Sequence, residues 1–141
     1  MLVAAFFQME LWPDVVRLLG DFQQRGLRLA FLTNLSEAML RSNMRPAGIE
    51  HFFQAALSTD RARAFKPAPE AYQLGVEEFG LKKEEVAFAA FAAWDATGAS
   101  WFGYPTAWVN RLGQQAESLG APPAVAGRDL AVLDDLLHRS G

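Results

Sequence analysis

Apolar residues along the chain follow two spacings, one typical of helices and one typical of buried strands. Between Val15 and Phe22 they recur every three or four positions, which predicts an amphipathic helix over residues 13–24. A proline at the start and a glycine shortly after the end support this helix. Similar patterns predict further helices over residues 36–47, 69–79, 96–102 and 129–138.

Short and nearly continuous apolar runs lie between these helices. They predict strands over residues 27–32, 55–58, 86–92 and 106–110. Strands that are apolar throughout and alternate with helices are typical of a parallel sheet covered on both faces. The sequence therefore predicts an α/β fold with a mostly parallel sheet. Residues 114–127 contain two prolines and little pattern, so we expect them to form a surface loop.

Length, charge and composition narrow the range of functions. The 141 residues predict a single domain, 1–141. A net charge of −3 without a basic stripe argues against a nucleic-acid partner. The lack of cysteine removes disulfides, thiolate metal sites and cysteine nucleophiles. The apolar run over residues 2–7 is too short to span a membrane and lacks the basic flank of a signal peptide, so a cytoplasmic location is the default expectation.

Polar side chains come directly after two of the predicted strands. Thr33 and Asn34 follow one strand, where a hydroxyl and nearby amides can form a cradle for an anion. Trp94 and Asp95 follow another, and ligands in such folds bind beyond the carboxyl ends of the strands. Other interpretations stay open: simple strand termination for the first pair, packing for Trp94, and capping of the next helix by Asp95.

Lys66 and Tyr72 lie on either side of the start of the helix predicted over residues 69–79. Two prolines follow Lys66 and limit where it can point, so its ammonium could hold a nucleophilic carboxylate ionised. Most lysines are solvated at the surface, which is the alternative here. Tyr72 could reach a substrate carboxylate or be an ordinary core aromatic. Asp95 could also orient a hydrolytic water or bind magnesium.

Taken in order, these segments resemble the haloacid dehalogenase superfamily, and most of all its (S)-2-haloacid dehalogenases (type II). The resemblance rests on Leu32-Thr33-Asn34, Phe65-Lys66-Pro67, residues 93–99 and residues 102–111, and it extends over roughly residues 9–138. It implies a Rossmann-like three-layer core with a helical cap inserted after the first strand. That first strand lies in the middle of the sheet.

The resemblance also implies a hydrolase that acts on carbon–halide bonds of short 2-haloacids and needs no cofactor. An aspartate on the first strand attacks the carbon that bears the halogen, halide leaves, and water hydrolyses the ester. Three residues match catalytic positions of the family: Thr33, Lys66 and Asp95. Three others match positions beside the substrate or the halide: Asn34, Tyr72 and Trp94.

The sequence departs from the family pattern in two places. The opening motif, an aspartate followed by Tyr-Gly-Thr, has no counterpart, and neither does the cap with its arginine. We therefore expect an N-terminally incomplete core without the first strand and the cap, and little or no activity from a chain without the nucleophile. The Ser-x-Asn that often precedes the last motif is replaced by Ala90 and Ala92.

A gap in the middle of the sheet would leave backbone groups unpaired. We expect residues 2–7 to fill it with a substitute strand, from the same chain or exchanged with a second copy in a homodimer. An equally open alternative is that they end the helix that leads out of the cap.

Two other functions stay open at this point. A magnesium-dependent phosphatase of the same superfamily would use Asp95 as a metal ligand, but no second carboxylate stands close to it between residues 94 and 99. A non-catalytic remnant that dimerises would explain the lost aspartate, because an exposed sheet gap promotes association.

Overall fold

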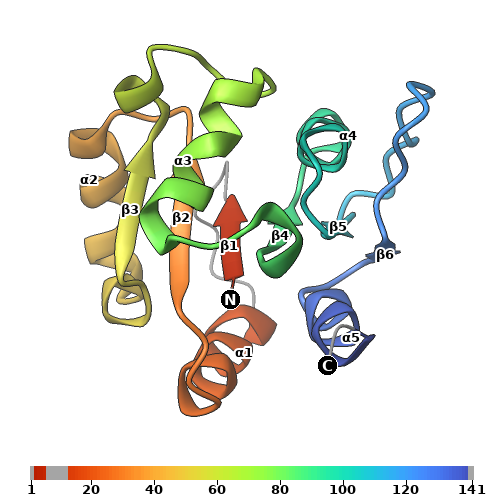
Figure 1. Ribbon diagram of the computed structural model, residues 1–141. Helices are drawn as coiled ribbons and strands as arrows, with labels where there is room; N and C mark the ends of the chain where they lie inside the picture. Colours follow the sequence, from red (N-terminus) through yellow and green to blue (C-terminus); the bar gives the residue numbers. More distant parts are fainter. Residues whose placement is uncertain (1, 6–12, 140–141) are drawn as a thin grey trace.

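The structure is a computed structural model that describes residues 2–5 and 13–139, with side chains for residues 14–42 and 48–139. Its six strands form one sheet in the order β3-β2-β1-β4-β5-β6, and every neighbouring pair is parallel (Figure 1). The strands are β1 (Leu2–Ala5), β2 (Leu29–Thr33), β3 (Ala55–Ser58), β4 (Ala87–Ala90), β5 (Thr106–Val109) and β6 (Val125–Gly127). The predicted α/β fold with a parallel sheet is confirmed.

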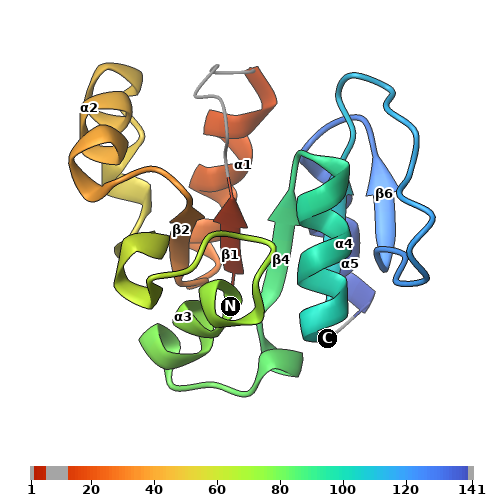
Figure 2. The same cartoon turned by 90° about the horizontal axis from the view of Figure 1, so that it is seen from above.

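Helices cover both faces of this sheet, as the two views show (Figures 1 and 2). They are α1 (Pro13–Gln24), α2 (Glu37–Ala47), α3 (Pro69–Phe79), α4 (Ala93–Phe102) and α5 (Ala131–Arg139). Helices α1 and α5 share one apolar core with the sheet, and α3 and α4 share the other. Three short 3₁₀ helices lie in the connections: η1 (Glu50–Phe52), η2 (Thr59–Ala62) and η3 (Lys83–Glu85).

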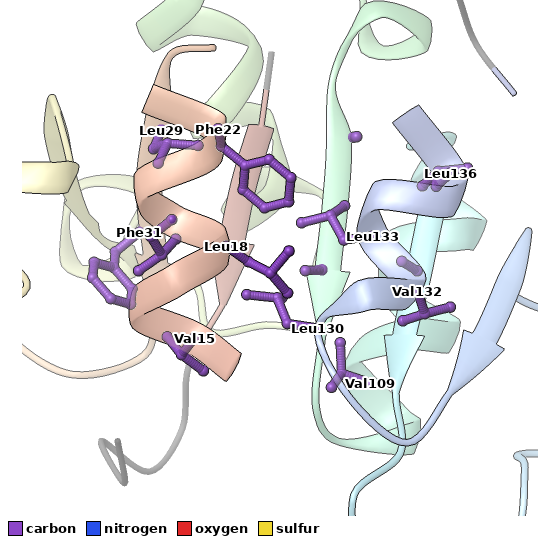
Figure 3. Packing of buried hydrophobic residues seen from close by; sticks show 14 of the residues in the cluster. Val15, Leu18, Phe22, Leu29, Phe31, Val109, Leu130, Val132, Leu133 and Leu136 are labelled. Atoms are coloured by element: carbon purple, nitrogen blue, oxygen red, sulfur yellow. The ribbon is translucent and has the colours of Figure 1, made fainter. Parts of the chain in front are cut away.

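Large apolar side chains fill both cores. In the first core, Phe22 of α1 and Leu133 of α5 point into the space between the two helices (Figure 3), and Leu29 and Val109 of the sheet belong to the same cluster. In the second, fully buried residues of α3 and the sheet pack together, Phe88 among them. Burial of one such side chain stabilises the fold by about 1.5–3 kcal/mol relative to exposure. These cores make the sheet a rigid support for the residues at its edge.

The strand β1 lies in the centre of the sheet, between β2 and β4. Leu2 is in register with Leu29 of β2, and Ala5 is in register with Ala90 of β4. The expected substitute strand is thus confirmed for Leu2–Ala5 within one chain, and the alternative that these residues form a helix is wrong. It supplies partners to backbone groups that would each cost about 1–3 kcal/mol if buried unpaired. The rest of the predicted segment, residues 6–7, lies outside the described residues.

Helix α4 begins earlier than its sequence pattern predicts. It starts at Ala93, three positions before the expected residue 96, and its N-cap residue Ala92 makes no capping hydrogen bond through its side chain. Asp95 therefore lies inside the first turn, and the interpretation that it caps this helix is wrong. Its carboxylate instead accepts hydrogen bonds from Lys66 and Tyr72.

The segment over residues 114–127 is only partly the surface loop that we expect from the sequence. Residues 114–124 form neither helix nor strand, but Val125–Gly127 is the strand β6 and pairs with β5. This strand has only three residues, Val125–Gly127, and they form no apolar run that would predict a strand. Its strand conformation is supported by pairing with β5.

The first turn of α1 forms hydrogen bonds with the segments that follow β5 and precede α5. The Asp14 carboxylate accepts hydrogen bonds from Arg111, at 2.9 Å, and from the Leu130 backbone N–H, at 3.0 Å. Burial by itself raises the pKa of Asp14, but these hydrogen bonds outweigh it and hold the pKa below its usual value.

Of the helices that the structure describes, none combines the length and apolar character needed to cross a bilayer.

Candidate functional site

The candidate residues lie at one edge of the sheet, where the carboxyl ends of its parallel strands meet. The strand order places β2 and β3 on one side of β1 and the later strands on the other. In α/β sheets such a reversal opens a crevice next to the strand ends, where ligands bind. Thr33 ends β2, and α4 with Asp95 begins shortly after β4. The arrowheads of β1 and β3 in Figure 1 point to this edge.

A buried ion pair forms the centre of the site. Lys66 Nζ lies 2.8 Å from Asp95 Oδ2, and the two side chains are only 1% and 4% exposed. The Tyr72 hydroxyl donates to the other carboxylate oxygen, Asp95 Oδ1, at 2.7 Å. Each oxygen of this carboxylate therefore has a strong partner. The position of Asp95 in the first turn of α4 adds the favourable field of a helix N-terminus.

Burial shapes the protonation of this group of three side chains. It lowers the pKa of Lys66, while the charge and hydrogen bond of Asp95 act in the opposite direction. Burial also raises the pKa of Tyr72, and the nearby negative charge of Asp95 raises it further. Tyr72 therefore remains a phenol that donates its proton to the carboxylate. The Asp95 carboxylate is thus bound by one cation, the Lys66 ammonium, and by one neutral donor, the Tyr72 hydroxyl.

Asn34 fixes the main chain that carries Lys66. Its Oδ1 accepts the Lys66 backbone N–H at 2.8 Å, and its Nδ2 donates to the Lys66 carbonyl at 3.4 Å. The next peptide bond, Lys66–Pro67, is cis. Two aromatic rings, Phe88 and Trp94, have their centroids 5.8 Å from Lys66 Nζ. The lysine that the sequence singles out is thus buried and held, and the alternative of a solvated surface lysine is wrong.

The structure joins the predicted residues to different degrees. Lys66, Tyr72 and Asp95 are in direct contact, and Asn34 joins them through the backbone of Lys66. Thr33 is buried one position before Asn34, and its Oγ1 accepts the N–H of the residue two positions on at 3.2 Å. A hydroxyl that accepts in this way can still donate one hydrogen bond.

Two residues that matter for this geometry escape the sequence analysis. A Cβ added at Gly98 would lie 2.6 Å from the Tyr72 hydroxyl oxygen and 2.7 Å from Pro67 Cβ, so only glycine lets α4 approach α3 this closely. The hydroxyl of Tyr104 donates to the backbone carbonyl of Tyr72. A glycine inside a helix is itself a signal, because it costs about 1 kcal/mol relative to alanine and usually has a packing reason.

The donor set does not fit a magnesium ion. Both oxygens of Asp95 are engaged, and the ammonium of Lys66 lies 2.8 Å from one of them, where it would repel a divalent cation. Magnesium prefers several oxygen ligands in an octahedral arrangement. Among the residues with described side chains, no group of three or more acidic or histidine side chains is placed to hold a metal ion.

Sequence comparison relates the chain to dehalogenases. The family model described as haloacid dehalogenase-like hydrolase matches residues 2–103. Haloacetate dehalogenase H-2 of Moraxella sp. (strain B) is 36% identical over 137 residues, which make up 97% of this chain and 60% of that protein. The (S)-2-haloacid dehalogenase of Pseudomonas sp. (strain YL) is 35% identical over 119 residues, or 84% of this chain and 51% of that protein.

Comparison with solved structures also finds dehalogenases. The crystal structure of the L-2-haloacid dehalogenase RSc1362 matches with a TM-score of 0.83 and 38% identity, over 92% of this chain and 56% of that chain. The chain therefore spans only between about half and three fifths of the length of these relatives. Since the family model covers most of its residues and the relatives match along nearly its whole length, the chain belongs to the haloacid dehalogenase-like hydrolases.

Proposed function

We propose that this chain forms the core of a hydrolase that removes halide from short 2-haloacids through an aspartyl ester. The observation that carries the proposal is the buried contact of Lys66, Asp95 and Tyr72 at the carboxyl ends of the central strands. The dehalogenase names of the similar proteins agree with it. The substrate is a small 2-haloacid, and the reaction needs no cofactor.

The chemistry has two steps. In the first, a carboxylate oxygen bonds to the carbon that bears the halogen, and halide leaves with the electrons of the broken bond. In the second, water attacks the carbonyl carbon of the ester, which releases a 2-hydroxy acid and a proton and restores the carboxylate. A nucleophilic carboxylate close to Asp95 would repel it, and the Lys66 ammonium offsets this repulsion for both groups.

The other residues receive roles consistent with their places. Asp95 orients the hydrolytic water or the lysine. Thr33 offers its hydroxyl to the reacting oxygen atoms. Asn34 and Trp94 border the halide, and Tyr72 holds Asp95 beside the substrate. None of the residues of β1, Leu-Val-Ala-Ala, carries a carboxylate, so we propose that this chain does not form the ester.

The test restores a carboxylate at the carboxyl end of β1. Ala5 stands there in register with Ala90 of β4, so Ala5→Asp adds an acid to the central strand, and Ala5→Asn is the matched control of the same shape. The assay measures halide release from (S)-2-chloropropionate, with mass spectrometry to detect the covalent ester. We expect release and ester from Ala5→Asp, and neither from Ala5→Asn or the unaltered chain.

Two outcomes would overturn the proposal. One is halide release by the unaltered chain at the rate of Ala5→Asp, which would show that the nucleophile lies elsewhere. The other is an Ala5→Asp chain that folds, as judged by circular dichroism, and yields neither halide nor ester. That second result would favour a non-catalytic protein, for which the lack of a carboxylate in β1 is the specific support. A homodimer that fills a gap in the sheet is no longer needed, because β1 of the same chain pairs with β2 and β4. Magnesium-dependent phosphate release would favour the phosphatase.

A further inference from the structure

Thr59 is joined to the site by a hydrogen bond to Asn34. It is fully buried at the start of η2, directly after β3. Its Oγ1 donates to Asn34 Oδ1 at 3.2 Å, the same atom that accepts the Lys66 backbone N–H at 2.8 Å. A carbonyl oxygen has two lone pairs, so these two donors use the full accepting capacity of the Asn34 amide.

These two donors decide which way the Asn34 amide faces. A flipped amide would place its NH₂ group against the backbone N–H of Lys66, which cannot accept a hydrogen bond. The observed orientation directs Nδ2 toward the Lys66 carbonyl, at 3.4 Å, and an amide nitrogen has a second hydrogen to offer. Thr59 therefore stabilises the orientation in which Asn34 holds both backbone groups of Lys66.

The turn that carries Thr59 is itself held in place. Ser58 Oγ donates to the Leu35 carbonyl at 2.8 Å and accepts the Asp60 N–H at 3.2 Å. The end of β3 is thus tied to the segment after β2 at two neighbouring points, through Ser58 and Thr59. A hydroxyl on such a support has little freedom to follow Asn34 if the amide moves.

We infer that Thr59 is a positioning residue of this site, which fixes Lys66 through the Asn34 amide and so aligns its ammonium with Asp95. The chain of contacts runs from the Thr59 hydroxyl to the Asn34 amide, to the Lys66 backbone, and from Lys66 Nζ to the Asp95 carboxylate. The inference deepens the proposed function because it concerns the same lysine, but its test needs no catalysis.

The test measures amide hydrogen exchange by NMR in the full chain. Thr59→Val replaces the hydroxyl by a methyl group of similar size, and Thr59→Ser retains the hydroxyl. The matched control is Thr106→Val in β5, because Thr106 is also buried and its hydroxyl donates to the Tyr104 carbonyl two residues before it at 2.9 Å. The readout is the exchange rate of the Lys66 N–H relative to that of the Leu133 N–H in α5.

We expect Thr59→Val to raise the relative exchange rate of the Lys66 N–H about five- to tenfold, the factor that one lost hydrogen bond between neutral groups represents. Thr59→Ser and Thr106→Val should leave it unchanged. A general loss of stability would raise both rates together, so the ratio separates positioning from folding.

The inference is overturned if the ratio in Thr59→Val equals that in Thr106→Val. If Thr59→Val does not fold, Thr59→Ser still decides, because a raised ratio in that variant would mean that the methyl group and not the hydroxyl holds Asn34. Failure of the proposed function would appear separately, as a lack of ester in the Ala5→Asp assay with the exchange result intact.

Discussion

Asp95 is a carboxylate that the fold keeps from water. With 4% of its side chain exposed, it depends on Lys66 and Tyr72 for the interactions that solvent would otherwise supply. Desolvation of two charges costs several kcal/mol per ion, and their attraction inside the protein returns this cost only if the geometry is good. Such a pair adds little net stability by comparison with apolar residues, but the loss of one member leaves a buried charge without compensation.

Substitution Lys66→Met should therefore destabilise the chain strongly. It keeps an unbranched side chain of similar length but removes the cation, so Asp95 retains only the Tyr72 hydroxyl as a side-chain donor among the contacts described above. We expect the free energy of unfolding in urea to fall by about 3–5 kcal/mol. The double substitution Lys66→Met with Asp95→Leu should recover most of the loss, because no charge stays buried. A loss below about 1 kcal/mol, the value of a surface ion pair, would contradict the buried geometry.

Helix α4 packs close to α3, and this close packing places Asp95 of α4 in contact with Tyr72 of α3. Gly98 lies one turn after Asp95 on the same helix face, opposite the Tyr72 hydroxyl. The contact between Tyr72 and Asp95 thus depends on the absence of a side chain at one helical position. Two effects oppose each other at this glycine, since alanine favours the helix by about 1 kcal/mol and overpacking costs about 1–3 kcal/mol.

Gly98→Ala should consequently lower the thermal stability, although alanine is the better helix former. The matched control is Gly20→Ala in α1, where Phe52 Cε1 at 4.0 Å is the nearest described atom that an added Cβ would meet. We expect Gly20→Ala to stabilise the chain by about 0.5–1 kcal/mol and Gly98→Ala to destabilise it by about 1–3 kcal/mol, both from calorimetry. Equal stabilisation in the two variants would show that α4 and α3 do not meet as described.

The contrast between these helices also shows what the sequence can predict. The bounds of α1 and α3 match the prediction because each starts at a proline and a glycine follows its end. The predicted start of α4 at residue 96 is wrong because the N-cap of this helix, Ala92, has no side-chain group that could mark the true start in the sequence. Lys66 and Asp95 are recognisable in the sequence, whereas the contact between Thr59 and Asn34 joins positions 25 residues apart that share no local pattern.

At the scale of the whole molecule, the site and the second core form one structure. Tyr72 holds Asp95 with its hydroxyl and belongs with its ring to the core between α3, α4 and the sheet. Tyr104 donates to the Tyr72 carbonyl, and its ring stacks on Phe88 of β4 with centroids 5.6 Å apart. Neither phenol can reach water unless this core opens, so the two tyrosines report on the state of the entire fold.

An alkaline titration of the unaltered chain should show this coupling directly. The sequence contains two tyrosines, and burial raises the pKa of each above the usual value of 10.0, with the charge of Asp95 adding to the effect at Tyr72. Above about pH 10 the two tyrosines keep their protons in the folded chain and lose them in the unfolded chain, so their contribution to stability should fall as the pH rises beyond that point. Ultraviolet absorbance should detect no tyrosinate near pH 10 until the chain unfolds, and then the full change in one step.

Tyr104→Phe is the control, and it should halve the tyrosinate signal on unfolding without any signal from the folded chain, because Tyr72 remains buried against Asp95. A folded chain in which one tyrosine ionises near the ordinary pKa would contradict the burial of that phenol. If this tyrosine is Tyr72, the carboxylate of Asp95 lacks its second donor, and the arrangement of the site would have to be revised together with the packing of α3 against α4.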